Sequence, residues 1–148
     1  TGTGRRFEAK GTVKGATLID DYAHHPTAVE LNLSTARALA RGRIVCVFQP
    51  HTYTRTLKLL PEFSQALAQA DLAIIVDIYA AREPDQGQIH ARDLVEGIRT
   101  CGGDARYAAS FEEAARMAAD GLAADDLVMT MGAGDVYRVG DHMRAFGA

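Results

Sequence analysis

Apolar and polar residues alternate along the chain with two different periods, and the shorter period occurs only near the start. Small or apolar residues occupy positions 7, 9, 11 and 13 of the stretch RRFEAKGTV, which is the period of a half-buried strand. A second strand-like run, ATLIDDYA, follows Lys14 and Gly15, a pair suited to a tight turn. These residues predict an N-terminal β-hairpin.

From residue 26 onward, helical patterns and short apolar runs take turns. Apolar residues recur near helical spacing in five segments: PTAVELNLSTARALAR, PEFSQALAQA, ARDLVEGIRT, SFEEAARMAADGL and VYRVGDHMRAF. Capping-box pairs, Thr27 with Glu30 and Ser110 with Glu113, mark two helix starts. The glycines after Cys101 offer a left-handed helix end. Four apolar runs between the helices predict strands: RIVCVF, LAIIVDI, DARYAA and DLVMTM.

This alternation of strands and helices favours right-handed crossovers, and therefore a mostly parallel sheet with helices on both faces. We predict a three-layer, Rossmann-like α/β domain that carries the β-hairpin at its N-terminus. The chain has 148 residues, of which 47% are hydrophobic and 24% charged. That length and composition suit one hydrophobic core, so we expect residues 1–148 to form a single domain.

Charge and cysteine usage narrow the class of partners. The 16 basic and 19 acidic residues are well mixed and give a net charge of −3, which leaves no broad basic face for nucleic acid or an anionic membrane. No apolar run approaches the roughly 18 residues that span a bilayer, and the first residues lack a signal peptide's apolar segment. Cys46 and Cys101 form no CxxC pair or disulfide framework. We expect a cytoplasmic protein that binds neither nucleic acid nor membrane.

Four polar clusters each follow directly after a predicted strand. They occupy residues 20–25, 49–55, 79–83 and 132–135. Because parallel strands bring their carboxyl ends to one edge, and ligands of open α/β sheets bind in the crevice outside that edge, we expect these clusters to converge. In the second cluster, the guanidinium of Arg55 can bind a carboxylate or phosphate through two hydrogen bonds. The sequence therefore predicts a ligand site at this edge.

Each cluster also has a plainer interpretation. Asp20 or Asp21 could merely stabilise the positive end of the following helix, which contributes about 0.3 to 1 kcal/mol. His24 and His25 are adjacent, so at most one should face a ligand while the other packs or caps. The stretch GAGDVY indicates tight strand-helix packing first and anion contact second, because it does not complete a dinucleotide fingerprint.

Two alternative functions arise from the same residues. Carboxylate and imidazole groups are suitable ligands for zinc or manganese, so Asp20, Asp21, His24 and His51 could form a metal-dependent hydrolase. The chain could instead be a nucleotide-binding regulatory module. It contains no GxxxxGK[ST] loop, so any ATP chemistry that uses a P-loop requires another domain.

Five blocks of the sequence resemble the C-terminal domain of the Mur ligases in their order and separation: GRRFEAKG, LIDDYAHHPTAV, IVCVFQPHTYTRT, VDIYAAREP and MTMGAGDV. The resemblance covers the chain from Gly4 to about Gly140. Within that family the chain is most similar to the members that attach L-alanine. A related ligase that recycles a tripeptide shares the DDxAHHPT-like block but lacks FQPH.

The resemblance implies an ATP-dependent amide-forming ligase of bacterial peptidoglycan synthesis, built from three domains. This chain would be the third domain, inactive alone, after an N-terminal domain for the UDP-sugar and a central P-loop ATPase domain that binds most of the ATP and Mg²⁺. The substrates implied are UDP-N-acetylmuramate and L-alanine, joined through an acyl phosphate. By motif, Arg6 matches an ATP-contacting arginine and Asp21 an aspartate that binds the ribose.

Four other residues match positions that line the amino-acid end of the family's site: Tyr22, His24, His51 and Arg55. The resemblance identifies no certain catalytic residue and no metal ligand, since positioning two reactants can itself supply much of the rate. The chain departs from the family in two places. Thr52 stands where many relatives have a second arginine, which reduces the positive charge for a carboxylate, and Arg82 stands where many have glycine.

Overall fold

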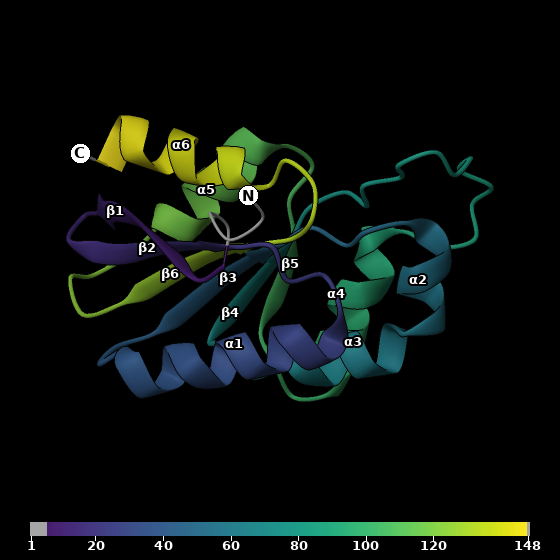
Figure 1. Cartoon of the computed structure of the whole chain (residues 1–148), viewed down its shortest axis with the longest axis horizontal. Coiled ribbons are helices and arrows are strands. Elements are labelled where there is room, and N and C mark those ends of the chain that lie inside the picture. The colour runs from purple at the N-terminus through teal and green to yellow at the C-terminus, as the bar shows by residue number, and fades with distance from the viewer. Residues whose placement is uncertain (1–5, 148) are drawn as a thin grey trace.

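The computed structural model describes residues 6–147 and contains one six-stranded sheet (Figure 1). The strand order is β1-β2-β6-β3-β4-β5, in which β1 is antiparallel to β2 and all other neighbours are parallel. The strands are β1 (Glu8–Val13), β2 (Ala16–Asp21), β3 (Ile44–Phe48), β4 (Leu72–Ile75), β5 (Ala105–Tyr107) and β6 (Leu127–Met131). The predicted mostly parallel α/β sheet with an N-terminal hairpin is therefore confirmed.

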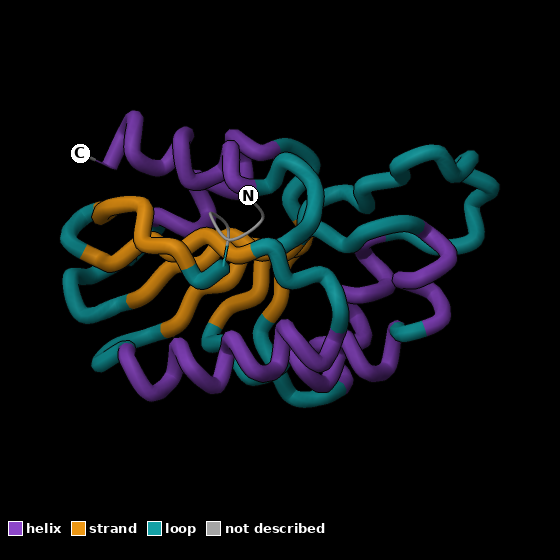
Figure 2. The backbone as a smooth tube through the Cα atoms, in the orientation of Figure 1, coloured by secondary structure: helices purple, strands orange, loops and turns teal. Residues whose placement is uncertain are grey.

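Helices cover both faces of the sheet, as Figures 1 and 2 show. The helices are α1 (Pro26–Leu39), α2 (Tyr53–Lys58), α3 (Leu60–Leu67), α4 (Ala91–Thr100), α5 (Phe111–Ala119) and α6 (Tyr137–Gly147). Helices α1, α3 and α4 pack on one face with Ile44, Cys46 and Phe48, while α5 and α6 pack on the other with Val45 and Val47. This alternation along β3 produces one core on each side of the sheet, which confirms the three-layer prediction.

The first strand departs from its predicted pattern. Only Val13 of β1 is buried, although alternation predicted that Ala9 and Gly11 would share its face. The pairing with β2 shifts register between Ala9 and Thr12, and Gly11 has a φ of 109°. Such a bulge breaks the period of two, and an edge strand tolerates it because only one neighbour pairs with it.

Two helix starts also differ from the predictions. The cap of α1 is His25 rather than Thr27, because Pro26 occupies the first helical position and His25 Nδ1 accepts a hydrogen bond from the Thr27 N–H at 3.4 Å. Helix α2 was not predicted at all. By contrast, Ser110 caps α5 through the Glu113 N–H at 3.1 Å, as expected.

Both cysteines are free thiols. Cys46 is fully buried in β3, and this burial raises the pKa of its thiol to about 12. Cys101 is exposed at the end of α4, where Gly102 has the predicted left-handed conformation with a φ of 88°. No helix in the part of the chain that the structure describes is both long and apolar enough to cross a membrane.

Candidate functional site

Loops that follow four parallel strands meet at one edge of the sheet. The Gly132 N–H donates to the Asp21 carbonyl at 3.1 Å, which joins the β6 and β2 loops. The Thr52 N–H donates to the Tyr79 carbonyl at 2.8 Å, which joins the β3 and β4 loops. The Gln49 N–H completes the connection by donating to Met131 at 3.0 Å. The four polar clusters therefore converge, as the sequence predicted.

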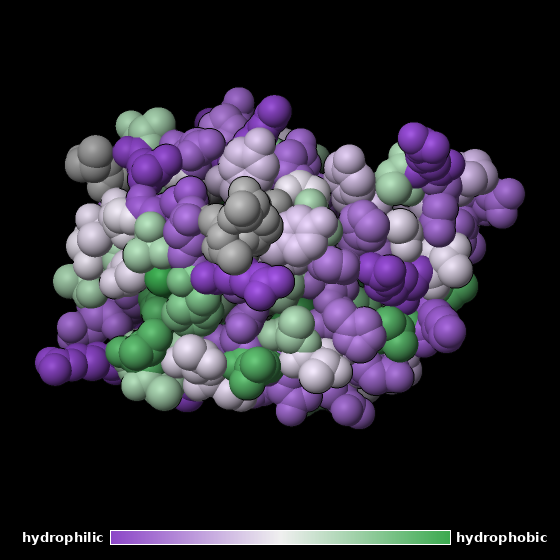
Figure 3. Space-filling model, in the orientation of Figure 1, coloured by the Kyte–Doolittle hydropathy of each residue, from purple (hydrophilic) through white to green (hydrophobic). Residues whose placement is uncertain are grey.

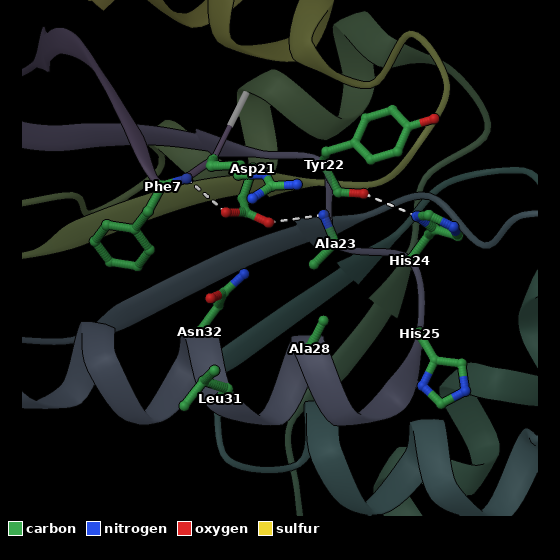
Figure 4. A pocket seen from close by; sticks show the side chains of 10 residues that line it. Phe7, Asp21, Tyr22, Ala23, His24, His25, Ala28, Leu31 and Asn32 are labelled. Atoms are coloured by element: carbon green, nitrogen blue, oxygen red, sulfur yellow. Dashed lines mark hydrogen bonds between the residues drawn. The ribbon is translucent and has the colours of Figure 1, made fainter. Parts of the chain in front are cut away.

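A pocket of about 450 Å³ opens between the end of β2, the first turns of α1 and the residues before β1 (Figure 4). Its lining combines a cation, a carboxylate and apolar side chains. The lining residues are Arg6, Phe7, Asp21, Tyr22, Ala23, His24, His25, Ala28, Leu31 and Asn32. Six of them, Phe7, Ala23, His25, Ala28, Leu31 and Asn32, were not predicted as site residues. The last three share one face of a helix because they are spaced three and four residues apart.

Asp21 is the most firmly held polar residue of this pocket. Its Oδ2 accepts a hydrogen bond from the Phe7 N–H at 2.5 Å and its Oδ1 accepts one from the Ala23 N–H at 2.7 Å (Figure 4). The side chain is buried, with 6% of the residue's surface exposed. A carboxylate has about four acceptor positions. Asp21 can therefore hold its loop and still accept hydrogen bonds from hydroxyl groups of a ligand, next to the exposed guanidinium of Arg6.

Four aromatic rings form a continuous row from this pocket across the neighbouring loops. The ring centroids are 5.2 Å apart for Tyr22 and His24, 5.5 Å for His24 and His51, and 5.6 Å for His51 and Tyr79. His24 Nδ1 also lies 3.0 Å from the Tyr22 carbonyl oxygen. His25 takes no part in the row, because its ring caps α1. His25 caps a helix, as expected for one of the two adjacent histidines, although both rings also line the pocket.

Arg55 lies beyond the row, on α2, and is half-buried. Neither His51 nor Arg55 lines the pocket that holds Asp21. We expected these residues to lie around one site, and of Asp21, His24, His51 and Arg55 this pocket includes only the first two. Arg55 is held on the unpredicted helix α2, and the site consists of two adjoining regions that meet where His24 contacts His51.

The burial of His51 and two neighbouring cations favour its neutral form. Burial lowers the pKa of the imidazole first, and the nearby His24 and Arg55 lower it further, while Glu83 opposes them. Glu83 itself holds the start of α2, because its Oε1 accepts from the Tyr53 N–H at 2.7 Å and the Thr54 N–H at 3.0 Å. These hydrogen bonds lower the pKa of the Glu83 carboxyl. A neutral imidazole beside a guanidinium can accept a proton or a hydrogen bond from a ligand.

We expect His51 to titrate below the ordinary histidine value of 6.5. Since the unfolded chain binds this proton more readily, the stability contributed by neutral His51 is present above about pH 6.5 and is lost as the pH falls toward the folded-state pKa. An NMR titration of the His51 ring signal measures the midpoint. His24→Gln should raise that midpoint by removing one neighbouring charge, and a wild-type midpoint at or above 6.5 would contradict the expectation.

The positions of the carboxylates do not support the metal-dependent hydrolase. Asp20 is buried and its Oδ1 accepts from the Thr130 Oγ1 at 2.7 Å, whereas Asp21 binds backbone N–H groups at the pocket. Between residues 6 and 147 there is no group of three or more His, Cys, Asp or Glu side chains that could hold a metal ion.

Exposed hydrophobic residues gather around α1 on the face shown in Figure 3. Leu31, which lines the pocket, is 65% exposed and Leu39 on the same helix is 62% exposed. An apolar wall beside Asp21 and Arg6 suits the flat, apolar part of a ligand whose other end is polar or charged.

Comparison with known proteins identifies the family. The family described as "Mur ligase, glutamate ligase domain" matches residues 5–134. The UDP-N-acetylmuramate–L-alanine ligase of Acetivibrio thermocellus is 51% identical over 141 residues, which cover 95% of this chain and 30% of the relative. The chain thus spans about a third of the length of the curated relatives that it matches.

Solved structures show the same fold. The UDP-N-acetylmuramate–alanine ligase of Thermotoga maritima superposes with a TM-score of 0.74 at 23% identity, over 96% of this chain and 30% of that one. A domain from a proposed UDP-N-acetylmuramate:L-alanyl-γ-D-glutamyl-diaminopimelate ligase of Haemophilus ducreyi superposes at 0.72 with 24% identity, covering 97% of this chain and 100% of that one. With its sheet, its site edge and these matches, the chain belongs to the Mur ligase family, in which it corresponds to the glutamate ligase domain.

Proposed function

We propose that this chain is the C-terminal, third domain of an ATP-dependent ligase that joins L-alanine to the lactyl carboxylate of UDP-N-acetylmuramate. The identity of 51% to a ligase of that name, over nearly the whole chain, supports this choice. The main structural support is that the site at the sheet edge has two adjoining regions. One contains Arg6 and Asp21, and the other contains the neutral imidazole of His51 and the guanidinium of Arg55.

The pocket beside α1 is the proposed nucleotide side. Asp21, fixed by two backbone N–H groups, accepts hydrogen bonds from the ribose hydroxyls, and Arg6 contacts the phosphates. Ala28 and Leu31 supply apolar surface next to them. The chain has no P-loop and no metal-binding group among residues 6–147. The central domain of the parent ligase would therefore bind most of the ATP and the Mg²⁺.

The region around the ring row is the proposed amino-acid side. Arg55 binds the carboxylate of L-alanine through its planar guanidinium, and Tyr22, His24 and His51 surround the remainder of the molecule. Because the pKa of His51 is lowered, its ring remains neutral and does not repel the incoming ammonium group. Thr52 is uncharged, and its hydroxyl caps α2 by accepting a hydrogen bond from the Arg55 N–H at 3.3 Å.

In the proposed reaction, ATP supplies the phosphoryl group that converts the lactyl carboxylate into an acyl phosphate. The neutral amine of L-alanine then attacks the carbonyl carbon and loses a proton to solvent. The carbon–oxygen bond to the phosphate breaks with its electron pair passing to the phosphate, which leaves an amide bond. ADP and phosphate are the other products. The residues of this chain hold the amino acid and the nucleotide in position, which can lower the barrier without a general base.

A chimera tests this function. The 141 matching residues of the Acetivibrio thermocellus ligase are replaced by this chain, and ADP release is measured with UDP-N-acetylmuramate, with and without L-alanine. We expect ADP release that depends on L-alanine, and a product whose mass equals the sugar nucleotide plus one alanine residue. The chain by itself should hydrolyse no ATP.

The same assays separate the rival functions. A folded chimera that releases no alanine-dependent ADP would contradict the proposal, as would ATP hydrolysis by the isolated chain. The regulatory-module alternative predicts instead that the isolated chain binds ATP tightly, which isothermal titration calorimetry measures directly. Our proposal requires that the isolated chain bind ATP weakly and that the chimera release ADP only when L-alanine is present.

A further inference from the structure

The loop between β3 and α2 holds two buried polar atoms without partners. Within residues 6–147, Gln49 Oε1 and His51 Nδ1 are the only buried side-chain nitrogen or oxygen atoms that form no hydrogen bond. A buried polar atom without a partner destabilises a fold, so such atoms are rare and require an explanation. Because both lie in one three-residue stretch at the candidate site, stability alone does not explain this arrangement.

Gln49 connects this stretch to the loop after β6. The residue is buried, with 5% of its surface exposed. Its Nε2 donates a hydrogen bond to Asp135 Oδ1 at 3.3 Å, across 86 positions of sequence. This bond fixes the orientation of the amide, since exchanging its oxygen and nitrogen would bring the oxygen against a carboxylate.

The loop of residues 132–135 lies directly against Gln49. A Cβ added to Gly134 would come within 2.5 Å of Gln49 Oε1 and 2.7 Å of Tyr79 Cδ2. A Cβ added to Gly132, whose φ is 151°, would come within 3.0 Å of the Gln49 carbonyl oxygen. Only glycine permits this approach. The amide of Gln49 and the ring of Tyr79 together form the surface on which the loop rests.

Tyr79 extends this contact to His51. The two rings are stacked with an interplanar angle of 11°, and the backbones pair through the Tyr79 N–H, which donates to the Pro50 carbonyl at 2.8 Å. A continuous path of contacts therefore runs from Asp135 through Gln49, Gly134 and Tyr79 to His51.

We propose that Gln49 is a positioning residue for the amino-acid side of the site: its amide, held by Asp135, fixes loop 132–135 against Tyr79 and so sets the place of the His51 ring. Gln49 acts through His51 and does not itself touch the amino acid. The effect on L-alanine rests on the proposed function. The coupling between the two loops rests on the contacts alone.

Exchanging the donor and the acceptor tests this coupling. Gln49→Glu replaces the donor with a second carboxylate facing Asp135, and at pH 8, well above the usual carboxyl pKa of about 4, the two charges repel. Asp135→Asn retains an acceptor for the Gln49 amide, so its effect should be small. In the double variant Q49E/D135N, the new amide can donate to the new carboxylate, which restores the hydrogen bond with its direction reversed.

NMR spectra of the isolated chain give the first readout. The Haemophilus ducreyi domain was solved as a separate chain of matching extent, which supports the use of the isolated domain. We expect the amide signals of Gly132 and Gly134 and the ring signals of His51 to move in Q49E and to return in Q49E/D135N. The control Q69E makes the same chemical change where Gln69 contacts Ser34 and Ala66, and it should leave these signals in place.

Gly134→Ala tests the same path without a charge. Its Cβ would displace Gln49 and Tyr79, so the His51 signals should move even if Q49E unfolds, and far-UV circular dichroism reports folding for each variant. Unchanged His51 signals in both folded variants, or a double variant no closer to wild type than Q49E, would overturn the proposal.

Kinetics of the chimera give the second readout. Q49E should raise the KM for L-alanine about tenfold, which corresponds to the loss of one well-placed contact, and Q49E/D135N should return it to within about threefold. The KM for ATP should stay within about threefold of wild type, because the contacts of Asp21 are unchanged. A KM for L-alanine that does not recover in the double variant contradicts the positioning role. If only the proposed function is wrong, the NMR signals of Gly132, Gly134 and His51 still move in Q49E and return in the double variant. Alanine-dependent ADP release is then absent in every variant.

Discussion

Asp21→Ala should lower the free energy of unfolding by about 3 kcal/mol, because it removes two hydrogen bonds to a charged acceptor and leaves the Phe7 and Ala23 N–H groups without partners. The loss is large because Asp21 is 94% buried, since 6% of its surface is exposed. Urea unfolding of the isolated chain, followed by circular dichroism, measures the change.

Two further variants calibrate this result. Asp21→Asn keeps one acceptor oxygen and should lose about half as much stability. Asp125→Ala removes an exposed carboxylate at the opposite edge of the sheet and should change the free energy of unfolding by less than about 0.5 kcal/mol. An Asp21→Ala protein as stable as Asp125→Ala would show that these hydrogen bonds do not hold the pocket together.

Arg55→Ala in the chimera should raise the KM for L-alanine about 100-fold, which corresponds to about 2.7 kcal/mol and is typical of a lost two-point bond to a carboxylate. Within residues 6–147, nothing accepts a hydrogen bond from the guanidinium of Arg55 and no carboxylate forms an ion pair with it. Its donors are therefore available to a ligand. Steady-state rates over a range of L-alanine concentrations provide the measurement.

Controls on the same helix separate charge from geometry. Arg55→Lys keeps the charge but loses the planar pair of donors, so we expect an increase of about tenfold. Lys58→Ala removes an exposed charge at the end of α2 and should leave the KM for L-alanine within about twofold. If Arg55→Ala and Lys58→Ala give equal KM values, Arg55 does not bind the carboxylate.

The sequence was sufficient to predict which loops meet, because parallel strands place their carboxyl ends together whatever the details of packing. It also placed His24 near His51, which the ring distance of 5.5 Å confirms. It did not predict α2, since the segment TYTRT has three threonines of low helix propensity and the helix depends on caps from Thr52 and the distant Glu83.

Other features depend on packing that the sequence pattern does not contain. Asn32 lines the pocket because of the way α1 is rotated against the sheet. Periodicity predicts which face of a helix is apolar, but it does not predict which loop lies beside that helix. The hydrogen bond from the Phe7 N–H to Asp21 depends on the register of the β1–β2 hairpin. That register shifts within β1, and the sequence pattern did not predict the shift. The role of Gln49 depends on contacts with residues 83 to 86 positions away, namely Gly132, Gly134 and Asp135, which no local pattern encodes.

The two thiols described above differ so much in accessibility that the protein can be labelled at a single position without mutagenesis. Cys46 is fully buried and its thiol pKa is about 12, so it forms almost no thiolate and should be inert to maleimide reagents. Cys101 is exposed and follows α4, at the edge of the sheet opposite the site loops. A fluorophore on Cys101 would therefore report on the protein from a position away from the site loops.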